Sequence, residues 1–177
     1  MKNLFFSIVL FFSFLSIFAN EPISSKEIVI NNEREAVLVG RQFYYLEDPT
    51  NNLTLDDILK PEYQNKFQLN EQDIFIRKPT ESAFWIQITT RNTTGKDSWI
   101  ELGSTFIWYI DFYTQLNGKY TLTTETGSLR PEKNKAYSSN LFLLPLGNTN
   151  NTQTVYIRIK TLRPIEIPIH IGSIASL

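Results

Sequence analysis

Three segments of the chain combine two side-chain patterns along one strand, and this combination constrains the fold more than any other feature. They are AFWIQITT at 83–90, FIWYIDFY at 106–113 and TVYIRIK at 154–160. In each segment, alternate residues form an apolar series, and the residues between them mix aromatic rings with single polar or charged groups. Because successive side chains of a β-strand point to opposite faces, each segment predicts a strand with one face toward a core and the other toward a more polar surrounding.

Much of the remaining sequence is typical of further short strands separated by turn residues. Asn117-Gly118 lies between two apolar runs and is the dipeptide most typical of a tight hairpin. Roughly eight to ten strands with almost no helix predict an all-β fold, for which we favour an antiparallel two-sheet jelly-roll sandwich. The final run, PIEIPIHIG at 164–172, contains Pro168, which cannot donate to a ladder, so this run is predicted to be an edge strand.

One short helix is expected near residues 54–60. Thr54 and Asp57 have the spacing of a capping box, and Asp56 and Asp57 place negative charge in the first turn. Pro61 is expected to end this helix, because proline cannot continue a helical hydrogen-bond ladder.

The opening sequence, MKNLFFSIVLFFSFLSIFAN, predicts a secretory signal peptide over residues 1–19 that is cleaved after Ala19. Its apolar run is shorter than the roughly 20 residues needed to cross a bilayer. An uncleaved membrane anchor is the alternative, because Ile17 is larger than the residue preferred at that position. Residues 20–177 are then expected to form one domain that is exported to the periplasm or the cell surface.

The composition argues against several functional classes. A formal net charge of -1 gives no electrostatic reason to expect nucleic acid as a partner. The chain has no cysteine and a single histidine, His170, so nucleophilic schemes and metal sites that depend on these residues lack their parts. Asp56 and Asp57 are adjacent on a helix and point about 100° apart, which suits a paired acid and base poorly. We therefore predict a protein that is not an enzyme and that has no cofactor and no metal.

The mixed faces of the three strands are the candidate ligand-binding site. Trp85 and Gln87 share this face in the first segment, Asp111 lies on it in the second, and Tyr156 and Arg158 lie on it in the third. A flat ring beside hydrogen-bonding groups suits a small polar ligand, with a saccharide as the favoured class. Two other interpretations stay open, namely a salt bridge between Asp111 and Arg158 across the sheet, and a protein interface on exposed rings.

The order of these segments resembles the type-2 extracellular sensor domain of bacterial seven-transmembrane receptors with diverse intracellular signalling modules (7TMR-DISM extracellular domain 2). The resemblance rests on YYLEDPTNNLTLDDIL, SAFWIQITTRN, WIELGSTFIWYIDFY, LFLLPL, TVYIRIKT and PIEIPIHIG, in that order. It implies a jelly-roll, carbohydrate-binding-like domain on the outer side of the cytoplasmic membrane that senses a small ligand. Gln87 stands where the Trp-x-Arg pattern of the family places arginine, so a ligand that needs that charge is not expected to bind.

In the receptors that the chain resembles, seven membrane helices and a cytoplasmic signalling module follow this domain. The sequence ends at Leu177, so we expect either a truncated receptor product or a free-standing module. The leading hypothesis is an exported sensor-type domain that binds a small polar ligand. The alternative is a protein-interaction or structural module of the cell envelope, with an envelope or membrane receptor protein as its partner.

Overall fold

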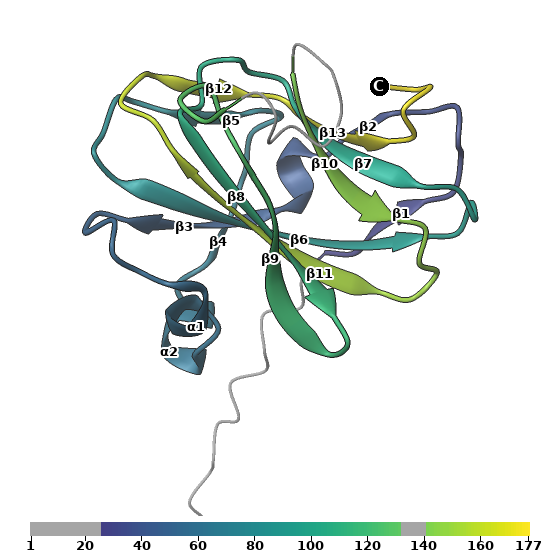
Figure 1. Ribbon diagram of the computed structural model, residues 1–177, viewed down its shortest axis with the longest axis horizontal. Helices are drawn as coiled ribbons and strands as arrows, with labels where there is room; N and C mark the ends of the chain where they lie inside the picture. Colours follow the sequence, from purple (N-terminus) through teal and green to yellow (C-terminus); the bar gives the residue numbers. More distant parts are fainter. Residues whose placement is uncertain (1–25, 132–140) are drawn as a thin grey trace, which may run out of the picture.

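The computed structural model describes residues 26–131 and 141–177, and the predicted signal peptide lies outside these residues. The described chain forms two larger sheets and one strand pair (Figure 1). The large sheet contains, in spatial order, β4 (Gln68–Leu69), β3 (Tyr44–Asp48), β6 (Ala83–Asn92), β11 (Gln153–Lys160), β8 (Tyr109–Leu116) and β9 (Lys119–Thr126), and β1 (Ile28–Ile30) pairs in parallel with β6. The small sheet contains β10 (Phe142–Gly147), β7 (Ser98–Leu102), β13 (Ile169–Gly172) and β2 (Val37–Leu38). The remaining pair is β12 (Ile165–Ile167) with β5 (Phe75–Arg77).

The apolar faces of the two larger sheets meet in the main core. Phe84, Ile86 and Ile88 of β6 are the residues that the alternation directs inward, and each is at most 1% exposed. They belong to one cluster with Ile100 and Leu102 of β7 in the opposite sheet. The prediction of an all-β, two-sheet jelly-roll sandwich is therefore confirmed.

The predicted hairpin between β8 and β9 is also confirmed. Asn117 and Gly118 have φ angles of 51° and 79°. Two successive residues with positive φ are what a two-residue turn needs to match the twist of the strands on either side.

The prediction of a single edge strand at the C-terminal end is wrong. Pro168 separates β12 from β13, and β13 lies between β7 and β2 in the small sheet. Pro168 occupies the break between the two strands, where no ladder bond requires its missing N–H. Its carbonyl accepts a hydrogen bond from the backbone N–H of Gly103 at 2.9 Å, which holds the break against the end of β7.

Two short helices, α1 (Leu55–Ile58) and α2 (Pro61–Gln64), are present where one was predicted. The capping box is present, since Asp57 N–H donates to Thr54 Oγ1 at 3.3 Å and Thr54 N–H donates to Asp57 Oδ2 at 3.0 Å. Pro61 begins the second helix, because proline at the first helical position loses no intrahelical bond. A 3-10 turn, η1 (Gly40–Gln42), precedes β3. None of the helices in the described ranges has the length and apolar character needed to span a bilayer.

The helix pair lies below the large sheet in Figure 1, on the face turned away from the main core. Ile58 of α1 and Phe67, which follows α2, form a second apolar cluster with Leu46 of β3, Trp85 of β6 and Tyr156 of β11. The outer face of the large sheet is therefore divided into a part that the helices cover and a part that they leave open.

Candidate functional site

Strand register places all the predicted site residues on the outer face of the large sheet, in two neighbouring rows. Trp85, Arg158 and Asp111 are direct neighbours across β6, β11 and β8. Gln87 and Tyr156 are neighbours in the next row. The shared face that the alternation predicts is therefore present, and the five residues do come together.

The first of these residues, Trp85, is buried. Its side chain is 0% exposed beneath the helix pair, and its ring centroid lies 5.6 Å from that of Tyr113. The described part of the chain offers its indole N–H no hydrogen-bond partner. The prediction that this face of β6 meets a more polar surrounding is wrong at Trp85, because alternation identifies the two faces of a strand and does not reveal that a helix covers one of them.

Gln87 and Tyr156 join the helix pair to the sheet. The Gln87 Nε2 atom donates to the Tyr156 hydroxyl at 3.0 Å and to Gln64 Oε1 of α2 at 3.1 Å. Gln64 Nε2 in turn donates to the Tyr156 hydroxyl at 3.2 Å and to the Ile58 carbonyl at 2.6 Å. The polar groups in this row are thus bonded within the protein, where they hold α2 in place.

Tyr120 of β9 extends the covered region. Its ring centroid lies 5.2 Å from that of Tyr156. Burial is the largest cause that raises the pKa of Tyr120 to about 12, and the neighbouring Tyr156 raises the pKa further. The folded protein therefore favours the neutral phenol of Tyr120. The contribution of this phenol to the free energy of unfolding is complete below the unfolded pKa of about 10 and is lost as the pH rises through about 12.

We expect Tyr120→Phe to remove part of the loss of stability at high pH. As the pH rises from about 10 to about 12, the free energy of unfolding should fall more steeply for the wild type than for the variant. Denaturant unfolding at a series of pH values measures both slopes. Thr121→Ala, an exposed change that removes no titrating group, is the control and should keep the wild-type slope. Equal slopes for Tyr120→Phe and the wild type would contradict the assignment.

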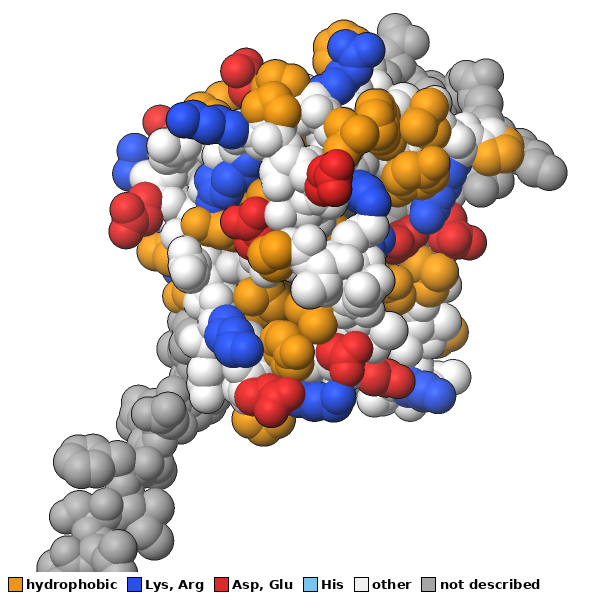
Figure 2. Space-filling view, turned by 90° about the vertical axis from the view of Figure 1, so that its left-hand side faces the viewer, with side chains coloured by type: hydrophobic (Ala, Val, Ile, Leu, Met, Phe, Trp, Pro, Cys, Tyr) orange, Lys and Arg blue, Asp and Glu red, His pale blue; other side chains and the backbone are white. Residues whose placement is uncertain are grey.

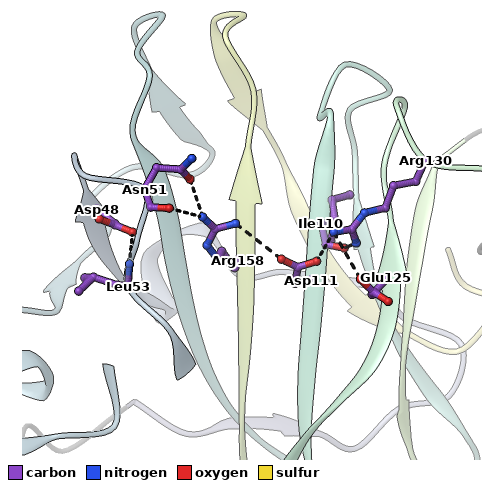
Figure 3. A network of polar contacts seen from close by, with 8 residues as sticks. All are labelled: Asp48, Asn51, Leu53, Ile110, Asp111, Glu125, Arg130 and Arg158. Atoms are coloured by element: carbon purple, nitrogen blue, oxygen red, sulfur yellow. Dashed lines mark hydrogen bonds and ion pairs between the residues drawn. The ribbon is translucent and has the colours of Figure 1, made fainter. Parts of the chain in front are cut away.

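Arg158 and Asp111 form the salt bridge that the sequence left open as an alternative to ligand binding (Figure 3). Arg158 Nη1 lies 3.6 Å from Asp111 Oδ2, and Arg158 Nη2 donates to the backbone carbonyl of Asn51 at 3.2 Å. Asp111 also pairs with Arg130, whose Nη1 donates to the Ile110 carbonyl at 2.8 Å. One carboxylate thus serves two guanidinium groups at the border of the covered region.

A tight turn after β3 positions Asn51 above Arg158. Asp48, which is 1% exposed, accepts from Thr50 Oγ1 at 2.7 Å and from the Leu53 N–H at 2.9 Å. Asn51 adopts a φ of 55°, a left-handed conformation that asparagine tolerates better than most residues. The Asp48 carboxylate therefore orders this turn, and Asn51 is a functional candidate that the strand patterns did not reveal.

Next to this network the outer face is open and forms a cavity. Its volume is about 450 Å³, and it is lined by Pro49, Thr50, Asn51, Glu81, Trp108, Tyr109, Leu129, Lys160 and Leu162. Lys160 and Tyr109 are neighbours across β11 and β8, one row beyond Arg158 and Asp111. The cavity therefore continues the predicted face by one row, and Asn51 belongs to both the network and the cavity wall.

The segment that enters β8 supplies the aromatic wall. The alternation predicts a strand from residue 106, but β8 begins at Tyr109, and Trp108 precedes it. The Trp108 N–H donates to the Lys160 carbonyl at 3.1 Å, and its carbonyl accepts from the Leu129 N–H at 3.2 Å. Gly127, with a φ of 134°, permits this close approach, since a Cβ atom there would come within 2.2 Å of the Trp108 carbonyl oxygen.

The polar wall comes from β11 and from the loop before β6. Lys160 lies two residues after Arg158 and so shares its face, whereas Glu81 lies on the loop. That loop is fixed beside Glu81, because Ser82 Oγ donates to Glu47 Oε1 at 2.7 Å. An ammonium, a carboxylate, an amide and two aromatic rings therefore line one open cavity. Extending the alternation by one row would have found Lys160 and Tyr109, but no strand pattern signals Glu81.

The two side chains that were considered for catalysis, Asp57 and His170, contact other side chains of the fold away from the cavity. Asp57 caps α1 and lies 2.7 Å from Lys60 Nζ. His170 Nδ1 lies 3.6 Å from a Glu101 carboxylate oxygen on the small sheet, away from the cavity lining. Within residues 26–131 and 141–177, no group of three acidic, histidine or cysteine side chains is arranged to hold a metal ion.

Comparison with models of known protein families finds a match along most of the described chain. The model described as 7TMR-DISM extracellular 2 matches residues 40–173. The matched region contains the helix pair, the ion network and every residue that lines the cavity. A search of curated proteins finds none that matches this chain.

Proposed function

Because the chain belongs to the 7TMR-DISM extracellular 2 family, a family of extracellular sensor domains, we propose that it is an exported input domain that binds a small polar ligand. The favoured ligand class is a saccharide, and the proposed role is binding without catalysis. The ligand lies in the cavity lined by Asn51, Trp108, Tyr109 and Lys160. Binding takes place on the outer side of the cytoplasmic membrane.

The observation that carries this proposal is the combination of two aromatic side chains with unlike polar groups in one open cavity. The apolar faces of a sugar ring stack on aromatic rings, and its hydroxyl groups bond to amide and charged side chains. The row of Gln87 and Tyr156 is less suited to this role, because its polar groups already bond to α2.

The five site residues predicted from the sequence support the cavity and do not contact the ligand. Arg158 and Asp111 hold Asn51 at the cavity wall, and Trp85, Gln87 and Tyr156 hold the helix pair. The ligand contacts Asn51 directly. Arg158 affects the ligand affinity only by positioning Asn51.

Trp108→Ala is expected to weaken ligand binding about tenfold or more, because the stacking surface is lost. Calorimetric titration with a panel of mono- and oligosaccharides measures the affinity. Trp99→Ala on the small sheet is the matched control and should bind as the wild type does. Unchanged affinity in Trp108→Ala, or a loss confined to Trp99→Ala, would place the ligand elsewhere.

A protein-binding role is the second candidate, and exposed apolar side chains favour it. Phe106 is 60% exposed, Leu129 is 57% exposed and Leu162 is 44% exposed. Figure 2 shows hydrophobic side chains gathered at several places between charged ones on one side of the molecule. An envelope or membrane receptor protein is the proposed partner in this case. A stable complex that Phe106→Ser weakens and that no saccharide displaces would favour this candidate.

A further inference from the structure

The charged groups at the cavity point to a narrower ligand class, in an inference that rests on the function proposed above. We infer that the cavity takes a saccharide that carries both a carboxylate and an ammonium group, that is, a carboxylated amino sugar. Lys160 and Glu81 line the same cavity and carry opposite charges. Lys160 binds the carboxylate of this ligand, and Glu81 binds its ammonium group.

Lys160 is a half-buried cation with which no described residue forms an ion pair. Its neighbours across the sheet are Ala83 on β6 and Tyr109 on β8, and neither carries a charge that balances the ammonium group. Among the ion pairs of the described residues, none includes Lys160, whereas Arg158 on the same face pairs with Asp111. Because burial withdraws water from an ammonium group, an arriving carboxylate gains a charge-assisted hydrogen bond there at a low desolvation cost.

Glu81 provides the opposite charge from a different element. It lies on the loop between β5 and β6, which Ser82 fixes through its bond to Glu47. Glu81 takes part in no ion pair with the residues that the structure describes, and it does not neutralise Lys160 although both line one cavity. Counting only the residues that the structure describes, the cavity lining therefore contains one charge of each sign without an ion-pair partner, the half-buried Lys160 and the exposed Glu81.

The remaining lining fits a sugar ring between these charges. Trp108 and Tyr109 supply aromatic surface, and Asn51 supplies an amide, in a cavity of about 450 Å³. Pockets of this size hold small ligands. A neutral sugar leaves both charges without a partner, and a sugar acid leaves Glu81 without one. A ligand with both groups satisfies the two charges at once.

The test compares four pyranoses in calorimetric titrations of the mature chain: glucose, glucosamine, glucuronic acid and muramic acid. Glucose carries no charged group, and glucosamine carries an ammonium group. Glucuronic acid carries a carboxylate, and muramic acid carries both groups. Muramic acid should bind about tenfold more tightly than glucosamine or glucuronic acid, since each charged group adds one charge-assisted bond. Raising the salt concentration should reduce this preference.

Two variants assign each charge to its residue. In Lys160→Met, muramic acid should bind no more tightly than glucosamine does, because the carboxylate has lost its partner. In Glu81→Gln, it should bind no more tightly than glucuronic acid. Lys78→Met removes a charge from the same loop as Glu81 but outside the cavity lining, and it should keep the wild-type order.

The outcomes separate this inference from the function on which it rests. If glucose binds as tightly as muramic acid and Trp108→Ala abolishes both, the cavity is a saccharide site and the charge assignment is overturned. The assignment is also overturned if the preference for muramic acid survives both Lys160→Met and Glu81→Gln. If none of the four sugars binds, the saccharide site and the charge assignment fall together.

Discussion

Replacing Trp85 with alanine is expected to lower the free energy of unfolding by about 3–5 kcal/mol. The indole is 0% exposed and packs in a cluster with Leu46, Ile58 and Phe67. Its removal leaves a cavity between the sheet and the helix pair that these short helices cannot readily fill. Urea unfolding followed by far-UV circular dichroism measures the change.

Trp108→Ala provides a matched control for this prediction. Trp108 is only partly buried and lines the open cavity, so its removal should change the free energy of unfolding by about 1 kcal/mol or less. If the two variants had equal stability and only Trp85→Ala lost ligand binding, Trp85 would be a ligand contact and not a core residue.

The second large effect is expected at Asp111. Asp111→Ala should lower the free energy of unfolding by about 3 kcal/mol, because among the described residues it leaves the largely buried Arg158 without a carboxylate and Arg130 with only the exposed Glu125. The side chains of Arg130 and Arg158 are 18% and 17% exposed. The double variant Asp111→Ala, Arg158→Met should recover part of the loss, since it removes the charge of Arg158.

Glu125 offers the control for Asp111. Its side chain is 54% exposed and lies 3.7 Å from Arg130, so Glu125→Ala should cost about 1 kcal/mol or less. Equal costs for Asp111→Ala and Glu125→Ala would show that the buried network contributes little to stability.

Local sequence patterns predict the sandwich because they report on strands one at a time. Phe84, Ile86 and Ile88 alternate with polar and aromatic residues, and this alone assigns the inward face of β6. Asn117-Gly118 assigns the hairpin, because few other pairs adopt its backbone conformation. The same alternation places Asp111 and Arg158 on one face, which made their salt bridge foreseeable.

The cover over Trp85 could not be predicted in this way. The capping box at Thr54 predicts that a helix begins there, but not which sheet face the helix packs against. That packing depends on Ile58 and Phe67 meeting Leu46 and Trp85 across the chain, which is a tertiary contact. An aromatic residue that a helix buries and one that is exposed occupy equivalent positions in the alternation of a strand, so the pattern does not distinguish them.

The cavity cannot be predicted from strand patterns for a related reason. Asn51 and Glu81 lie on loops that precede and follow other elements, and only the folded sheet brings them beside Lys160. Pro168 shows the same limit, because a proline in an apolar run is compatible with an edge strand and with a break between two strands. The break is what lets β13 lie inside the small sheet.

Ligand is expected to bind at the open row of the large sheet, which contains Tyr109 and Lys160, and not at the covered row of Gln87 and Tyr156. The most direct test follows the indole ¹H–¹⁵N signals of the three tryptophans while muramic acid, or whichever pyranose binds most tightly, is added. The Trp108 signal should shift with ligand concentration, and the Trp85 signal should stay in place and exchange slowly with solvent. A shift of the Trp85 signal with an unchanged Trp108 signal would contradict binding at the open row and place the ligand on the face beneath the helix pair.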